Sequence, residues 1–288
     1  MLSEFDVIRI VVLLAITLAY SLFDLFNNRE VPNLFAYGSV VVALALCITY
    51  MNSYTVVGIV IALIILGIGY LLYKTGFLGA GDVLELTAIA LLLPIQTTPL
   101  LVTTPQLGLP FVLSVFISSG YFAIIMLVLY YMAFARRNPL EKDFKIESKR
   151  VFMGFMIVVA YILLMVMLYT LTGMGVIGII LILALAIFSS VMLVYERLMN
   201  YRMVSMLLPK ELTPDDMIAT NLMNHDDLTY FKGVSKNFGR LATPKLIKDL
   251  ESEKKKLPVY RNAAPLAAFF FIGVVFSLLF GNLIFLII

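Results

Sequence analysis

The sequence predicts an all-α polytopic membrane protein of about eight transmembrane helices, with a small cytoplasmic domain before the last helix. Of its 288 residues, 62% are hydrophobic and 14% are charged, whereas soluble domains are about half apolar and about a quarter charged. Apolar runs near the length that crosses the hydrocarbon core, about 17–25 residues, recur along the chain. Lys and Arg gather in alternate connections between these runs, as the positive-inside rule expects.

The apolar runs are, in order, 7–23, 34–51, 54–73, 82–95, 111–134, 151–171, 175–195 and 264–286. No small-residue cleavage site follows the first run, so it is not predicted to be a cleaved signal peptide. The fourth run is short, and we expect an irregular or tilted continuation past Pro94. The single cysteine, Cys47, lies in the second run and is expected to be a buried apolar residue, because one cysteine cannot form an internal disulfide.

The placement of the 21 Lys and Arg residues predicts the topology. All but Arg9 lie in or beside the connections 24–33, 74–81, 135–150 and 196–262, whereas 51–54, 96–110 and 172–174 carry no charge. The first set is therefore predicted to be cytoplasmic, with both termini outside. This orientation brings Asp24 and Asp82 to the same cytoplasmic side of the bilayer.

The predicted domains are 1–134 as a membrane core, 135–150 as a basic cytoplasmic loop, 151–195 as a transmembrane hairpin, 196–262 as a cytoplasmic domain and 263–288 as the last transmembrane helix. In the cytoplasmic domain, Thr213-Pro214-Asp215-Asp216 predicts a helix start. Thr243-Pro244 predicts a second helix over 245–256. Residues 227–232, followed by Gly233, predict a short strand and turn. We interpret Lys254-Lys255-Lys256 as an anchor to anionic lipid.

Acidic residues are rare in the membrane core. Between Val7 and Leu140 they are Asp24, Glu30, Asp82 and Glu85. An ionisable side chain at membrane depth is costly and is by default a functional-site hypothesis. Two carboxylates within about 3 Å share one proton, so the ionised member can activate a water while the protonated member polarises a carbonyl. Asp24 and Asp82, at the ends of separate apolar runs, therefore predict aspartyl chemistry.

Gly79-Ala80-Gly81-Asp82 opens the fourth run. Glycines there let the backbone bend and approach another segment closely. We interpret them as making room for a substrate at the mouth of the helix. The alternative is a glycine-rich loop in which Asp82 only caps the helix, just as Asp24 can simply end the first one.

Three further charged residues are candidates for supporting roles. Glu85 lies three residues after Asp82 on the same helical face, where it can tune the pair, bind a cationic substrate residue or pair with Lys74. Arg29 and Glu30 can contact a charged substrate segment, although lipid anchoring is the favoured explanation for them.

The sequence offers few residues for metal-dependent, serine-protease or cysteine-protease chemistry. The chain has one His and one Cys, with no His-Glu-x-x-His or Gly-x-Ser-x-Gly motif. His225-Asp226-Asp227 are consecutive, which gives poor geometry for a single ion and favours a solvated loop. We expect no metal and no cofactor.

With these residues in place, the chain resembles the archaeal prepilin and preflagellin peptidases of the type IV prepilin peptidase family, the Gly-x-Gly-Asp membrane aspartyl proteases. The resemblance rests on Asp24 with Arg29-Glu30-Val31-Pro32-Asn33 and on Gly79-Ala80-Gly81-Asp82-Val83, and more loosely on Leu257-Pro258-Val259 and Phe280-Gly281-Asn282-Leu283. It implies that Asp24 and Asp82 are the catalytic pair. It also implies a six-helix core, to which 151–195 adds a hairpin.

The implied substrate is the short charged leader of pilin-like precursors, cut at the cytoplasmic face. The implied partners are therefore these precursors and membrane lipid, without nucleic acid. Family members that also methylate carry paired Cys-x-x-Cys motifs after the first span. None occurs here, so methyl transfer is not expected.

Two other functions stay open from the sequence. One is a presenilin- or signal-peptide-peptidase-like protease that cuts within a membrane helix, although that family has its Gly-x-Gly-Asp later in the chain. The other is a cation- or proton-coupled transporter using Asp24, Asp82 and Glu85. The sequence predicts neither the precursor that is cut nor the oligomeric state.

Overall fold

The structure is a computed structural model that describes residues 4–27, 30–49, 55–76, 78–94, 99–101, 110–137, 147–196, 198, 203–214, 216–260 and 265–287. The chain divides into two compact units. Unit 1 contains Met1–Gly69, Ala80–Tyr195 and Pro265–Ile288, and unit 2 contains Tyr70–Gly79 and Glu196–Ala264.

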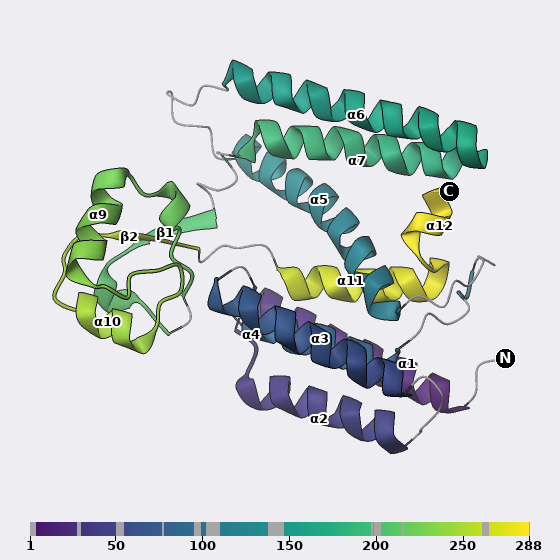
Figure 1. The fold of residues 1–288 in the computed structure, drawn as a ribbon, viewed down its shortest axis with the longest axis horizontal. Helices are drawn as coiled ribbons and strands as arrows, with labels where there is room; N and C mark the ends of the chain where they lie inside the picture. Colours follow the sequence, from purple (N-terminus) through teal and green to yellow (C-terminus); the bar gives the residue numbers. More distant parts are fainter. Residues whose placement is uncertain are drawn as a thin grey trace. The chain divides into compact units, whose positions relative to one another are not determined.

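Each predicted apolar run forms helix (Figure 1). The helices are α1 (Glu4–Phe26), α2 (Asn33–Thr49), α3 (Thr55–Lys74), α4 (Ala80–Leu92), α5 (Phe111–Arg137), α6 (Ser148–Thr172), α7 (Val176–Val194), α11 (Leu266–Phe280) and α12 (Leu283–Ile287). Within the described chain, α1, α3, α5, α6 and α7 are long and apolar enough to cross a membrane. The structure is mostly helical, which is consistent with the predicted all-α, multi-pass membrane class. The count of eight spans stays a prediction.

The last apolar run is two helices, which corrects the single span predicted over 264–286. Helix α11 ends at Phe280, and Gly281 adopts a φ of 82°. That left-handed conformation strains any residue with a Cβ, so the glycine permits the break. The chain then enters α12, where the Asn282 side chain accepts the backbone N–H of Ile284 at 3.0 Å.

Helix α4 is the most enclosed element of unit 1. It packs against α1, α2, α5 and α11, and its residues from Glu85 to Leu92 are all buried. Its 13 residues span about 20 Å at about 1.5 Å per residue, less than the roughly 30 Å hydrocarbon core. The helix ends before Leu93 and Pro94, which are buried but not helical, and 95–98 lie outside the described residues.

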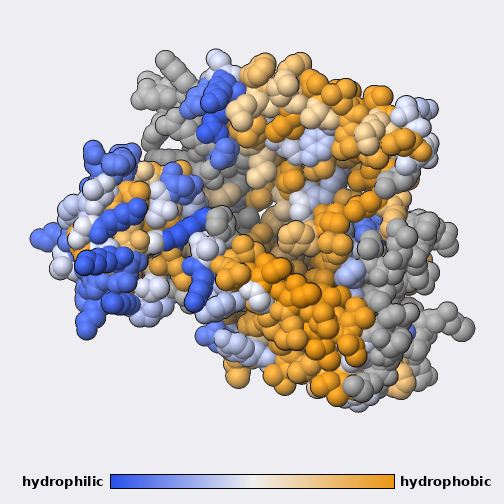
Figure 2. Space-filling model, in the orientation of Figure 1, coloured by the Kyte–Doolittle hydropathy of each residue, from blue (hydrophilic) through white to orange (hydrophobic). Residues whose placement is uncertain are grey.

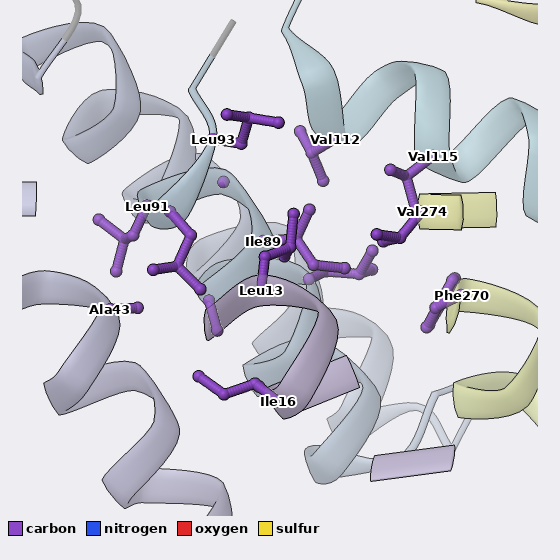
Figure 3. Close-up of a cluster of buried hydrophobic side chains, with 14 of the residues drawn as sticks. Leu13, Ile16, Ala43, Ile89, Leu91, Leu93, Val112, Val115, Phe270 and Val274 are labelled. Carbon is purple, nitrogen blue, oxygen red and sulfur yellow. The ribbon is translucent and has the colours of Figure 1, made fainter. Parts of the chain in front are cut away.

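Side chains of four other helices meet those of α4 (Figure 3). They are Leu13 and Ile16 of α1, Ala43 of α2, Val112 and Val115 of α5, Phe270 and Val274 of α11, and Ile89, Leu91 and Leu93 of α4 and the residues after it. Helix α3 approaches through a glycine, since a Cβ on Gly69 would lie 2.3 Å from Val83 Cγ1. Such small residues let helix backbones come close in membranes, where packing drives association.

Helices α6 and α7 lie side by side as a hairpin joined at Gly173 (Figure 1). Gly173 takes the left-handed conformation at the end of α6, with φ 70°. Large apolar side chains of α6 such as Leu163 and Met167 are exposed, as expected for a lipid-facing surface. Orange hydrophobic residues cover the helices of unit 1, whereas blue hydrophilic residues gather over unit 2 (Figure 2).

Unit 2 has its own apolar core beneath two strands and two helices. Strands β1 (Val204–Leu207) and β2 (Leu257–Tyr260) pair antiparallel, with α9 (His225–Val234) and α10 (Pro244–Leu250) beside them. The predicted helix start at Thr243 is confirmed, because its side chain accepts the N–H of Leu246 at 3.2 Å. The helix ends at Leu250, however, and does not reach residue 256.

Two predictions in unit 2 are wrong. No helix starts at Thr213: its N–H donates to the Asp216 carboxylate at 2.8 Å in an isolated turn, and Ile218 then bridges to Val259 in β2. Residues 227–232 are part of helix α9 and not a strand. Acids in its first turn suit a helix N-terminus, and Phe231 is buried in the unit's core. His225 therefore lies in a helix and not in a loop.

Lys255, which belongs to the predicted lipid anchor Lys254-Lys255-Lys256, makes contacts within unit 2. Its Nζ lies 2.5 Å from a carboxylate oxygen of Asp227 and 4.9 Å from the centre of the Tyr230 ring. The Tyr230 hydroxyl donates to the Glu253 carboxylate, and this hydrogen bond raises the pKa of the Tyr230 phenol.

Candidate active site

Helix α1 presents a polar stripe to the interior of unit 1. Arg9, Thr17, Tyr20, Ser21 and Asp24 are all buried, and they recur at the three- and four-residue spacing of one helical face. Asp24 lies in the last turn of the helix and is 9% exposed. Asp24 thus lies at the end of the first helix, as predicted from the sequence, and its carboxylate is buried in the protein.

The Asp24 side chain caps a helix from the other end of the chain. Its Oδ2 accepts the backbone N–H of Ala267, in the first turn of α11, at 3.1 Å in a buried position. The N-cap residue of α11 is Pro265, whose side chain offers no oxygen to the free N–H groups of that turn. A carboxylate at a helix N-terminus is a favourable arrangement. Asp24 therefore has a structural role besides any chemical one.

Asp82 lies in the first turn of α4, immediately after the glycines. Gly76, Gly173 and Gly281 are the glycines with positive φ in the described chain, so Gly79 and Gly81 do not adopt a left-handed conformation. A Cβ on Gly81 would make an ordinary contact with Val31, 3.4 Å from its Cγ2. Gly81 thus faces the connection between α1 and α2, where the sequence interpretation expected room for a substrate.

Glu85 is the most deeply buried acid of the site. It is 0% exposed, and both of its carboxyl oxygens lack a hydrogen-bond partner among the described residues. The charges of Asp82 and Asp24 both act on it. The ammonium of Lys74, the partner considered from the sequence, lies 4.8 Å from the centre of the Tyr70 ring. Glu85 is therefore an enclosed acid beside two others.

Tyr20 is a polar residue of the site that was not predicted from the sequence. Its hydroxyl lies 3.0 Å from Ser39 Oγ and 3.3 Å from the carbonyl oxygen of Ala36, linking α1 to α2. The charges of Glu85 and Asp82 also act on Tyr20. One clue was available, because a tyrosine four residues before Asp24 lies on the same helical face.

The other candidate residues contribute less. Glu30 is exposed, and its backbone N–H donates to the carbonyl of Asn27 at 2.8 Å in the turn after α1. Arg29 lies outside the described residues. Where the chain is described, no three His, Cys, Asp or Glu side chains are grouped to hold a metal ion.

The structure brings Asp24, Asp82 and Glu85 into one electrostatic cluster carried by α1 and α4, which pack against each other. Such a cluster in an apolar bundle can share protons, activate water or bind a cation. Comparisons with protein-family models, with curated proteins and with solved structures found no match to this chain. The function must therefore be argued from the residues of the cluster.

Proposed function

We propose that the protein is a membrane aspartyl endopeptidase that removes the short charged leader from type IV pilin-like precursors, either preflagellin or prepilin. The observation that carries the proposal is that two packed helices each hold one of the acids at an end: Asp24 is buried in the last turn of α1, and Asp82 lies in the first turn of α4. Two acids from different elements are what aspartyl hydrolysis requires.

In the proposed reaction, Asp24 and Asp82 share one proton between them. The ionised carboxylate removes a proton from a water, whose oxygen attacks the scissile carbonyl while the protonated carboxyl donates a hydrogen bond to the carbonyl oxygen. The N–H of Ala267 holds one oxygen of Asp24 and so restricts how its carboxylate turns. Neither a metal nor a cofactor takes part, and no methyl transfer is proposed.

The proposed topology places both aspartates at the cytoplasmic face and both termini outside. The distribution of Lys and Arg supports this orientation. Asp24 lies in the last turn of α1 and Asp82 in the first turn of α4, so a leader in the cytoplasm reaches the acids without crossing the bilayer.

The test uses the purified full chain in liposomes with a pilin-like precursor. Asp24→Asn and Asp82→Asn are each expected to abolish cleavage while the protein still accumulates. Asp6→Asn, at the opposite end of α1, is the matched control and is expected to cleave like the unaltered protein. Full activity in either aspartate variant would reject the pair. The product mass also separates leader removal from a cut within the membrane helix.

A cation- or proton-coupled transporter is the second candidate, and buried Glu85 is the observation that favours it. An enclosed acid in a membrane bundle is a recurring feature of proton relays. Ion uptake into liposomes that contain the purified protein, lost in Asp82→Asn, would support transport. The same liposomes without uptake but with precursor cleavage would support the protease.

A further inference from the structure

Glu85 has no task in the proposed hydrolysis, although it lies three residues after Asp82 in a helix that packs against the helix of Asp24. Its two oxygens are fully buried and lack hydrogen-bond partners within the described chain. Burying such a group without a partner is costly, and an unsatisfied buried group in a native protein calls for an explanation. A group supplied by the substrate would provide the missing partner.

The position of Glu85 along α4 indicates which part of the substrate supplies the partner of its carboxylate. Glu85 follows Asp82 by three residues, about 4.5 Å further along the helix and on the same face. Asp82 lies in the first turn, at the entrance of α4, whereas Glu85 lies among residues that are all buried. The leader of the proposed substrate belongs outside the bundle, and its apolar helix belongs alongside the bundle. Glu85 therefore lies on the apolar-helix side of the scissile bond.

We propose that Glu85 binds the amino group that hydrolysis creates at the start of the mature product, an inference that rests on the proposed function. Water adds to the scissile carbonyl, a C–O bond forms and the C–N bond breaks. The leaving nitrogen takes a proton from the aspartate pair. The proton of the new carboxylic acid then passes by way of the pair to the amine, so the products are a carboxylate and an ammonium group.

The ammonium group forms within an apolar bundle, where an unpaired charge is costly. Glu85 supplies the counter-charge, and the product supplies the N–H donors that both Glu85 oxygens lack. The basic residues of the leader are a poorer match, because they lie on the entrance side of Asp82. Glu85 is enclosed in the free protein, so its contact with the product forms only after the site has opened for the substrate, and catalytic contacts commonly tighten only with substrate.

The experiment compares two synthetic peptides as inhibitors of precursor cleavage. Both have the sequence of the mature segment of the precursor used in the assay. One begins with a free amino group and the other is N-acetylated. The unaltered protein is expected to bind the free amine about tenfold more tightly or better, the range of a charge-assisted hydrogen bond. Glu85→Gln is expected to bind both peptides equally.

Matched variants separate this contact from a general loss of structure. Glu85→Asp keeps the carboxylate and is expected to retain a preference for the free amine. Asp24→Asn, tested by direct fluorescence binding because it cannot cleave, keeps Glu85 and is expected to retain the full preference. Removing the positive charges of the leader is expected to change the KM of the unaltered protein and of Glu85→Gln by the same factor.

The outcomes distinguish the two proposals. If the unaltered protein cleaves the precursor but Glu85→Gln still prefers the free amine, the role of Glu85 is wrong and the protease stands. Equal binding of the two peptides by the unaltered protein would likewise reject the role of Glu85 and leave the protease proposal standing. If the unaltered protein does not cleave the precursor, the proposed function fails and the inference fails with it.

Discussion

The hydrogen bond between Asp24 and Ala267 is expected to contribute to the stability of the protein independently of any role of Asp24 in catalysis. Asp24→Asn keeps a side-chain oxygen that can accept the Ala267 N–H, whereas Asp24→Ala removes it. Both variants lose the carboxylate and are expected to be inactive. Only the alanine variant leaves the first turn of α11 without its acceptor, so the two are expected to differ in stability.

The expected difference follows from the geometry of the cap. The Asp24 Oδ2–Ala267 N distance is 3.1 Å and the contact is buried, which makes it an ordinary, well-formed hydrogen bond. Replacing a capping side chain by alanine typically costs about 1 kcal/mol. For a chain of this size that is about 2–4 °C in Tm. Asp24→Ala is therefore expected to melt about 2–4 °C below Asp24→Asn.

Thermal unfolding of the purified variants in one detergent measures this difference. Asp82→Ala and Asp82→Asn provide the control pair: Asp82 lies in the first turn of its own helix, and these substitutions leave the Ala267 contact intact. If Asp24→Ala and Asp24→Asn melt at the same temperature, the Asp24–Ala267 contact does not stabilise the protein and the reasoning is refuted.

Three further predictions concern single substitutions at Gly81, Gly69 and Lys255. Gly81→Ala is expected to retain cleavage within a few-fold, because its Cβ would only touch Val31; loss of activity would show that the motif requires the glycine itself. Gly69→Ala places a Cβ against Val83 and is expected to lower the Tm by several degrees, since overpacking costs about 1–3 kcal/mol. Gly67→Ala, whose Cβ would meet nothing within 4 Å, is its control, and equal Tm values would contradict the packing of α3 on α4. Lys255→Ala is expected to cost no more than about 1 kcal/mol by thermal unfolding, because exposed ion pairs are weak; a larger loss would mean that unit 2 depends on this contact.

The helices of unit 1 could be predicted because hydrophobicity over about 20 residues is a strong and local property. The structural features that were not predicted depend on single residues or on contacts between distant parts of the chain. Gly281 breaks the last apolar run through its backbone conformation, which hydrophobicity does not reveal. The enclosure of α4 depends on which helices surround it, and a short apolar run looks the same whether lipid or protein covers it.

In the candidate site too, the residues that composition reveals were predicted and the residue that depends on a tertiary contact was not. Asp24, Asp82 and Glu85 stood out because acids are rare in apolar segments, and composition alone reveals that rarity. Tyr20 did not stand out, because a tyrosine in a membrane helix is common and its link to Ser39 is a tertiary contact. In unit 2, residues 227–232 were wrongly predicted as a strand because Gly233 was interpreted as a turn, whereas it lies in the last turn of the ten-residue helix α9.

The start of helix α11 shows how the capping role of Asp24 could be predicted from a sequence. Its N-cap residue is Pro265, so a helix in an apolar bundle begins without a side-chain acceptor at that position. Buried N–H groups need acceptors, and in an apolar segment with few polar residues the acceptor must come from another helix. A buried acid elsewhere is then a candidate cap, and Asp24 fills that place. Because a cap needs only an oxygen whereas hydrolysis needs a carboxylate that exchanges protons, asparagine at position 24 should retain the first role and lose the second.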